Sequence, residues 1–185
     1  IYKTTAYQFN NTEHAANLFG LKEFGNIYSR LGNPTVGALE ARLTALEEGA
    51  MCVALSSGTS AVMYSLINIM SQGDNFVTAN QLYGGTYTMF DNILPEYGID
   101  SKKVDITDLA AVENAIDDKT RAIYCETITN PGLVVADISA LSEIAHSKGI
   151  PLIVDATFTT SAILKPFEYG ADTVSYTHLR AHETS

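Results

Sequence analysis

The sequence predicts an α/β domain with three layers, α/β/α, around a mostly parallel sheet. Two observations support this fold class. Short apolar segments of strand length alternate along the chain with amphipathic segments of helical periodicity. The strand segment PLIVDAT (residues 151–157) is apolar on both faces up to its acidic residue, which is typical of parallel strands covered by helices on both sides.

The first part of the chain is predicted to be an arm followed by a helix. Residues 1–33 are polar and irregular, with one short helical segment at 13–21, and we interpret them as an N-terminal arm. Pro34 fits the first turn of the next helix, and Gly49 ends that helix. The apolar residues of this helix are spaced by four and three positions: Leu39, Leu43 and Leu46.

The rest of the chain alternates between strands and helices until Val174, where the apolar periodicity stops. Strands are expected over residues 50–57, 75–80, near Lys103, 121–127 and 151–157. Helices are expected from Gly58 onward and over residues 86–94, 109–116 and 138–146. We identify no repeat, low-complexity tract or internal linker.

The composition excludes several classes of protein. The net charge is −10 and no basic cluster is present, so we expect no nucleic-acid partner. No apolar run approaches the ~20 residues of a membrane span. Cys52 and Cys125 each lie in an apolar run and are interpreted as buried reduced thiols of a cytoplasmic protein, with a disulfide or metal pair as the alternative. We expect no metal site, although His178 and His182 are four residues apart. Ile1 is not an initiator Met, so we expect the N-terminus to be incomplete.

The segments that follow the predicted strands are rich in polar residues. They read SSGTS, QLYGG, ETITNP and VDATF, and each contains serine, threonine, glycine, asparagine or an acid. Because parallel strands place their ligands at their carboxyl ends, these four segments predict one site at one edge of the sheet.

Two residues in these segments suggest a cofactor that carries both an anion and a cation. Gly58 lies where a strand is expected to turn into a helix, and the free amides there suit a phosphate; a simple capping turn is the alternative. Asp155 ends an apolar strand, where a carboxylate is costly to bury without a positive partner such as a protonated ring nitrogen. The alternative for Asp155 is a helix cap or a local turn. The P-loop lysine and the full GxGxxG pattern are absent, which disfavours ATP and NAD.

Two aromatic residues are weaker candidates. Tyr83 precedes two glycines, and its ring could stack on a flat ligand, although a loop tyrosine is more often packing. Tyr28 and Arg30, in YSRLGNPT, suit an anion contact made from outside the domain, with an ordinary surface arginine as the alternative.

The segments YSRLGNPT, ALSSGTSA, QLYGGTY, ETITNP and LIVDATF, in this order and spacing, resemble the Cys/Met-metabolism enzymes that use pyridoxal 5'-phosphate (PLP). The resemblance covers residues 1 to about 174. It implies the fold-type-I large domain of PLP-dependent transferases over residues 34–174, incomplete and without the C-terminal domain of the family. Within the family, the opening residues are most similar to O-acetylhomoserine sulfhydrylases.

The resemblance also implies the roles of individual residues. The backbone amides of Gly58 and Thr59 would bind the cofactor phosphate. Tyr83 would stack on the pyridine ring and assist proton transfer, and Asp155 would pair with the pyridinium nitrogen; these two are the expected catalytic residues.

Four further residues complete the cofactor site implied by the resemblance. Thr157 would lie beside the ring and Asn130 near its phenolic oxygen. Tyr28 and Arg30 would reach the phosphate of a neighbouring subunit, which implies a dimer or a larger homo-oligomer.

The end of the chain departs from the family. The family continues into a Ser-x-Thr-Lys motif whose lysine binds PLP covalently. Counting without gaps places those three positions at Thr177, Leu179 and Arg180. Arginine is a poor amine for such a bond because its guanidinium stays protonated. We interpret residues 175–185 as a tail foreign to the family, and we expect the chain alone to be inactive.

The resemblance implies a γ-replacement reaction that converts O-acetyl-L-homoserine and sulfide into homocysteine and acetate. A methionine or cystathionine γ-lyase of the same family is the alternative, because it shares these residues. A second alternative is a non-catalytic PLP-binding or assembly module that keeps the phosphate cradle and lacks the lysine.

Overall fold

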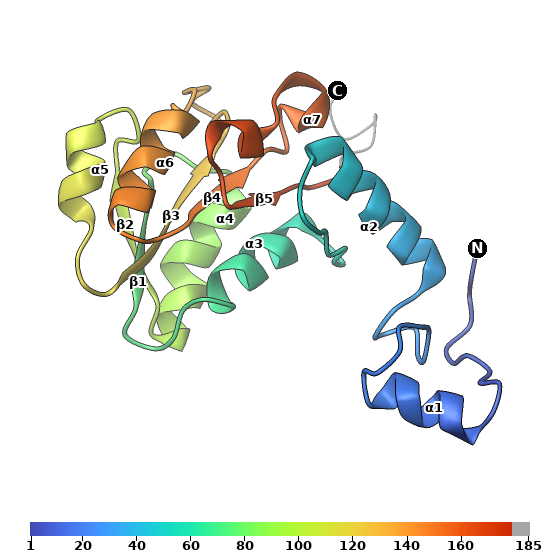
Figure 1. Ribbon diagram of the computed structural model, residues 1–185. Helices are drawn as coiled ribbons and strands as arrows, with labels where there is room; N and C mark the ends of the chain where they lie inside the picture. Colours follow the sequence, from blue (N-terminus) through green and yellow to red (C-terminus); the bar gives the residue numbers. More distant parts are fainter. Residues whose placement is uncertain (179–185) are drawn as a thin grey trace. The chain divides into compact units, whose positions relative to one another are not determined.

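The computed structural model describes residues 1–178 and contains a sheet of five parallel strands in the order β2-β1-β3-β4-β5 (Figure 1). The predicted parallel α/β architecture is therefore confirmed. The strands predicted around residues 75–80, Lys103, 121–127 and 151–157 are all present. Their bounds are β1 (Asn75–Ala79), β2 (Asp100–Val104), β3 (Thr120–Glu126), β4 (Leu152–Asp155) and β5 (Thr173–Ser175).

The longer helices begin after a polar side chain that accepts one of the free amides of the first turn. These capping residues are Asn11, Asn33, Ser57, Asp108 and Asp137. The helices are α1 (Thr12–Phe19), α2 (Pro34–Glu47), α3 (Gly58–Ile67), α4 (Gly84–Thr88), α5 (Leu109–Ala115), α6 (Ile138–Ser147) and α7 (Thr160–Ile163).

One predicted helix, over residues 86–94, is wrong in its detail. The chain forms the short α4, then a π-helical turn (Met89–Ile93) and a 3₁₀ turn (Leu94–Tyr97). Pro95 has no amide hydrogen, so the regular α-helical ladder cannot continue through it. A second 3₁₀ turn, Pro166–Tyr169, precedes β5.

The connections of the sheet diverge between β1 and β3. Strand β1 leads to β2 on one side, whereas its neighbour β3 leads to β4 on the other side. Helix α6 packs on β3 and β4 and contacts α5, while α3 contacts α4 (Figure 1). In open parallel sheets, ligands bind beyond the carboxyl ends of the strands where the connections diverge. The fold therefore predicts a ligand site at the loops that follow β1 and β3.

The chain divides into two compact units, Ile1–Ala54 and the residues from Leu55 onward. The first contains α1 and α2, and a short antiparallel bridge joins Ala6 to Tyr28. None of the helices in residues 1–178 has the length and apolar character that a bilayer crossing requires.

The strand predicted over residues 50–57 is wrong, because this segment forms no strand. The segment is apolar, but an extended chain becomes a strand only when a neighbour takes up its backbone hydrogen bonds, and it pairs with none of the five strands. The side chains of Met51 and Val53 are exposed as a result. Cys52 is likewise half-buried, not buried as predicted, whereas Cys125 is buried; both are free thiols.

The core of the second unit lies on both sides of β1 and β3. Phe90 is fully buried there and makes edge-to-face contacts with Phe76 and Tyr124, at ring-centroid distances of 4.8 and 5.1 Å. Aromatic pairs in this geometry stabilise a core beyond the apolar area that they bury. These rings fix the first strand of the sheet against the helical segment that follows it.

Replacing Phe90 with Ala is expected to lower the free energy of unfolding by about 3–5 kcal/mol, because the change leaves a cavity among packed rings. Urea unfolding followed by circular dichroism measures this loss. Phe24→Ala is the matched control, since the Phe24 side chain is fully exposed and its removal should change stability by less than about 0.5 kcal/mol. Equal effects of the two substitutions would contradict this description of the core.

Candidate functional site

The carboxyl ends of three neighbouring strands bring polar side chains together. Glu126 at the end of β3 is in register with Asp155 at the end of β4, and Asp155 is in register with Ser175 at the end of β5. The loop after β1 reaches the same edge, because the Tyr83 amide donates a hydrogen bond to Glu126. The predicted convergence of the strand-end segments is thus seen for the loops that follow β1, β3 and β4.

Asp155 is a mostly enclosed carboxylate whose partners are neutral. Its Oδ1 accepts a hydrogen bond from the Thr157 amide (2.9 Å) and its Oδ2 accepts one from the Ser175 hydroxyl (3.2 Å). Burial raises the pKa of Asp155, and these hydrogen bonds only partly oppose that effect. Within residues 1–178, no lysine, arginine or histidine forms an ion pair with it. A cationic ligand group would supply the missing partner.

Glu126 also belongs to this site, although it is not among the site residues predicted from the sequence. It is 6% exposed, and its carboxylate accepts hydrogen bonds from two backbone amides, Tyr83 to Oε1 (2.7 Å) and Asn130 to Oε2 (3.0 Å). Burial raises its pKa to about 7, against the two amide hydrogen bonds and with a further contribution from Asp155. The sequence does contain a feature that indicates Glu126 as a site residue, because Glu126, like Asp155, is an acid that ends an apolar strand.

Gly58 and Thr59 open α3 and offer backbone amides. The first backbone hydrogen bond of the helix runs from the Ala61 amide to the Ser57 carbonyl (3.1 Å), so the amides of Gly58 and Thr59 precede the helical ladder. Thr177 lies so close to Gly58 that a side-chain carbon at this position would overlap it. Only glycine allows this approach, while the free amides at the start of α3 are groups of the kind that bind small anions.

Tyr83 and Asn130 belong to the loops that follow β1 and β3, and Glu126 connects their backbones. The Tyr83 ring is 54% exposed, so one face can contact a ligand. A side-chain carbon on Gly85 would approach this ring to 2.7 Å, so Gly85 leaves room for it. Asn130 precedes a cis peptide bond to Pro131.

Thr157 joins Asp155 to the end of the described chain. Its amide donates to Asp155, and its hydroxyl oxygen accepts a hydrogen bond from the Thr177 amide (2.9 Å). Asp155, Thr157 and Thr177 therefore lie at one place, and Thr177 also contacts Gly58. This chain of contacts connects the proposed phosphate end of the site to the buried carboxylate.

Tyr28 and Arg30 lie in the first unit, where the Arg30 guanidinium lies over the Tyr28 ring at 5.0 Å from its centroid. They form a pair with each other, as their spacing of two residues allowed. Leu179, Arg180 and His182 lie outside the described residues. Among the described residues, no group of three potential metal ligands is present.

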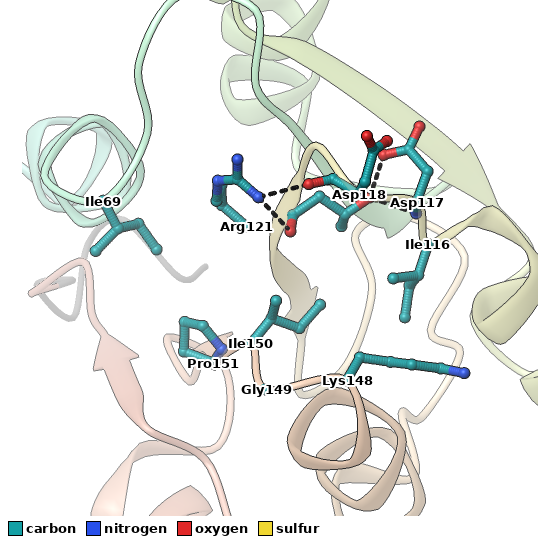
Figure 2. Close-up of a pocket in the computed structure, with 10 residues that line it drawn as sticks. Ile69, Ile116, Asp117, Asp118, Arg121, Lys148, Gly149, Ile150 and Pro151 are labelled. Carbon is teal, nitrogen blue, oxygen red and sulfur yellow. Dashed lines mark hydrogen bonds between the residues drawn. The ribbon is translucent and has the colours of Figure 1, made fainter.

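A separate cavity of about 560 Å³ lies at the opposite, amino-terminal edge of the sheet (Figure 2). Its cationic groups are already paired with other described residues: Arg121 with the Asp118 carbonyl and the Asp74 carboxylate (both 2.9 Å), and Lys148 with Glu113 (2.8 Å). The Asp118 side chain, which also lines the cavity, is exposed. We place the candidate site at the carboxyl edge, where Asp155 forms no ion pair with any of residues 1–178.

Replacing Glu126 with Gln is expected to remove a pH-dependent part of the stability. The folded-state pKa is about 7 and the ordinary value is 4.5, so between these values the folded protein keeps a proton that the unfolded chain has released. The stability is therefore full at low pH and falls as the pH rises through 7. Between pH 5 and 8 the free energy of unfolding of the wild type, relative to the variant, should fall by roughly 2–3 kcal/mol. Urea unfolding at several pH values measures this difference, and parallel pH profiles for the two proteins would contradict it.

The fold and this site define an α/β protein with free amides at the start of α3 and a mostly enclosed carboxylate, Asp155, at the carboxyl edge of the sheet. A family model described as "Cys/Met metabolism PLP-dependent enzyme" matches residues 1–180. The chain belongs to this family, and the resemblance identified in the sequence is confirmed.

Curated relatives and solved structures agree with this assignment. The chain is 45% identical to O-acetyl-L-homoserine sulfhydrylase from Leptospira meyeri, over 100% of the chain and 42% of that relative. It is 47% identical to homocysteine synthase from Schizosaccharomyces pombe, over 95% and 41%. The chain therefore spans well under half the length of these relatives.

Two crystal structures extend the comparison. One from Campylobacter jejuni bears the name O-acetylhomoserine (thiol)-lyase and contains N'-pyridoxyl-lysine-5'-monophosphate. It matches with a TM-score of 0.92 and 43% identity, over 96% of this chain and 44% of its own. Cystathionine γ-lyase from Lactobacillus plantarum, in complex with L-serine, matches with a TM-score of 0.85 and 36% identity, over 95% and 44%.

Proposed function

We propose that this chain provides the cofactor-binding part of a PLP-dependent sulfhydrylase acting on O-acetyl-L-homoserine. In this reaction the bond between Cγ and the acetate oxygen breaks, a bond between Cγ and sulfur forms, and homocysteine and acetate are released. The observation that supports this assignment most directly is the 45–48% identity to relatives from Leptospira and Fusarium that are named as sulfhydrylases, against 36% to the γ-lyase.

The residues of the site fit PLP. The cofactor carries a phosphate, a flat ring and a ring nitrogen that can be protonated, and it supplies an electron sink for bond cleavage at the substrate. The amides of Gly58 and Thr59 would bind the phosphate. Asp155, whose pKa is raised by burial, would keep the proton on the ring nitrogen. Tyr83, with an exposed ring, would contact the pyridine.

Thr157 and Asn130 would complete the site beside the ring, while Tyr28 and Arg30 would contact the phosphate of a second copy of the chain. A homo-oligomer is therefore part of the proposal. The family lysine that binds PLP covalently corresponds to Arg180 in a gapless count. This chain alone is consequently proposed to bind PLP without a covalent bond.

The test uses the protein expressed from the complete gene, taken as residues 1–174 followed by the family's lysine motif and C-terminal domain, and purified with PLP. It is assayed with O-acetyl-L-homoserine plus sulfide, and separately with methionine or cystathionine alone. We expect homocysteine formation to be the faster reaction. Faster release of methanethiol from methionine, or of cysteine from cystathionine, would assign the protein to the γ-lyases. Loss of both activities together with retained PLP binding would support the non-catalytic module instead.

A further inference from the structure

The two loops at which the sheet connections diverge are joined by one side chain. The loop after β1 contains Tyr83 and the loop after β3 contains Asn130, 47 positions later in the sequence. Glu126 accepts the backbone amide of each, through Oε1 at 2.7 Å and Oε2 at 3.0 Å. The carboxylate thus uses one oxygen for each loop.

We propose that Glu126 is a positioning residue that fixes the Tyr83 and Asn130 loops relative to each other and so sets the geometry of the cofactor site. This inference rests on the proposed function, since it assumes that PLP binds between these loops. Glu126 itself is not proposed to touch the cofactor or the substrate.

The choice of residue supports a bridging role. A carboxylate at 6% exposure is costly to bury, and an apolar side chain would avoid that cost. What an apolar residue cannot do is accept two hydrogen bonds in two directions. Tyr83 also precedes α4 without a side-chain cap of its own, and the Glu126 carboxylate satisfies its amide from another strand.

The charges around Glu126 are consistent with this role. The ionisable groups that interact with it electrostatically are Asp155 on β4 and Tyr124 and Cys125 on β3. Of these, Asp155 disfavours the ionised form of Glu126, whereas Glu126 in turn raises the pKa of Tyr124 and of Cys125. The amides of Tyr83 and Asn130 are the groups that favour the ionised form of Glu126, and the carboxylate is directed at both.

The experiment compares three proteins expressed from the complete gene: wild type, Glu126→Gln and Glu126→Ala. Glu96→Gln is the matched control, because Glu96 is exposed and lies in the turn after α4. Amide hydrogen exchange is measured by mass spectrometry on the cofactor-free proteins, for peptides that cover residues 81–88 and 128–133. The dissociation constant of PLP is then measured by equilibrium dialysis.

In the Ala variant we expect both peptides to exchange about tenfold faster or more, while peptides from β3 and β4 keep their protection. Gln has the same size but a single acceptor oxygen, so it should restore protection in one of the two loops and not in both. We expect PLP to bind about tenfold more weakly to the Ala variant and to an intermediate degree to the Gln variant. The Glu96→Gln control should match the wild type in both measurements.

Unchanged exchange in both peptides of the Ala variant would overturn the proposal. Faster exchange with wild-type PLP affinity would also overturn it, because Glu126 would then stabilise the loops without shaping the cofactor site. If the wild type itself bound no PLP, the proposed function would fail, whereas the exchange data would still report whether Glu126 bridges the loops. The Gln variant, with its preserved volume, keeps the test decisive if the Ala variant does not fold.

Discussion

Asp155→Asn, introduced in the protein expressed from the complete gene, is expected to lower kcat/KM for O-acetyl-L-homoserine at least about a hundredfold, or ~2.7 kcal/mol of transition-state stabilisation. Asn keeps an oxygen that can accept from the Thr157 amide, so the local fold should be preserved. It removes the negative charge that would keep the cofactor ring nitrogen protonated, and without that proton the ring withdraws electrons poorly. The loss is therefore expected in catalysis more than in folding.

The matched control for this variant is Asp118→Asn. Asp118 is exposed and lies at the opposite edge of the sheet, beside the cavity of Figure 2. Both variants are compared by initial rates, thermal unfolding and the absorbance of bound PLP. Wild-type kcat/KM in Asp155→Asn would contradict the role proposed for this carboxylate, whereas an equal loss in the control would indicate a general effect on stability.

The 185-residue chain by itself is expected to form homocysteine at least about a thousandfold more slowly than the protein expressed from the complete gene, even with PLP present. Two observations support this expectation. A gapless count from the family motif would put Arg180 at the position of the cofactor-binding lysine, and a guanidinium stays protonated at any working pH. The chain also spans only 42% of the length of the Leptospira relative.

Borohydride reduction followed by peptide mass spectrometry gives an independent measurement. A covalent bond between PLP and a lysine would be trapped as a stable adduct, and we expect none in the 185-residue chain. The Campylobacter jejuni protein, whose structure contains N'-pyridoxyl-lysine-5'-monophosphate, serves as the positive control. An adduct on Lys165, the nearest preceding lysine, together with turnover would show that the chain has its own anchor.

The elements that the sequence predicted well are those whose pattern is local. Strand β3 has the apolar run AIYC at its centre, strand β4 is apolar up to Asp155, and helix α2 begins at a proline with an asparagine cap. The strand prediction for residues 50–57 was wrong because a strand also requires a neighbouring strand. The apolar residues of a segment do not specify which strand it will pair with. Propensity alone could not distinguish a strand from an extended connection there.

The residues of the candidate site likewise divide into those that the sequence could indicate and those that it could not. Asp155 could be singled out because a charge at the end of an apolar run is anomalous by itself. Glu126 presented the same anomaly, but its importance depends on hydrogen bonds to amides in two different loops, and those contacts exist only in the folded chain. Tyr28 and Arg30 were predicted to act on another subunit, which no pattern within one chain can test.

The two outer strands of the sheet, β2 and β5, differ in the features that discourage another strand from pairing with them. Strand β2 carries Lys102 and Lys103, and charged side chains on an outer strand discourage another strand from adding to it. Strand β5, Thr173–Ser175, is short and carries no charge. Both outer strands therefore limit extension of the sheet, β2 through its charged side chains and β5 through its short length.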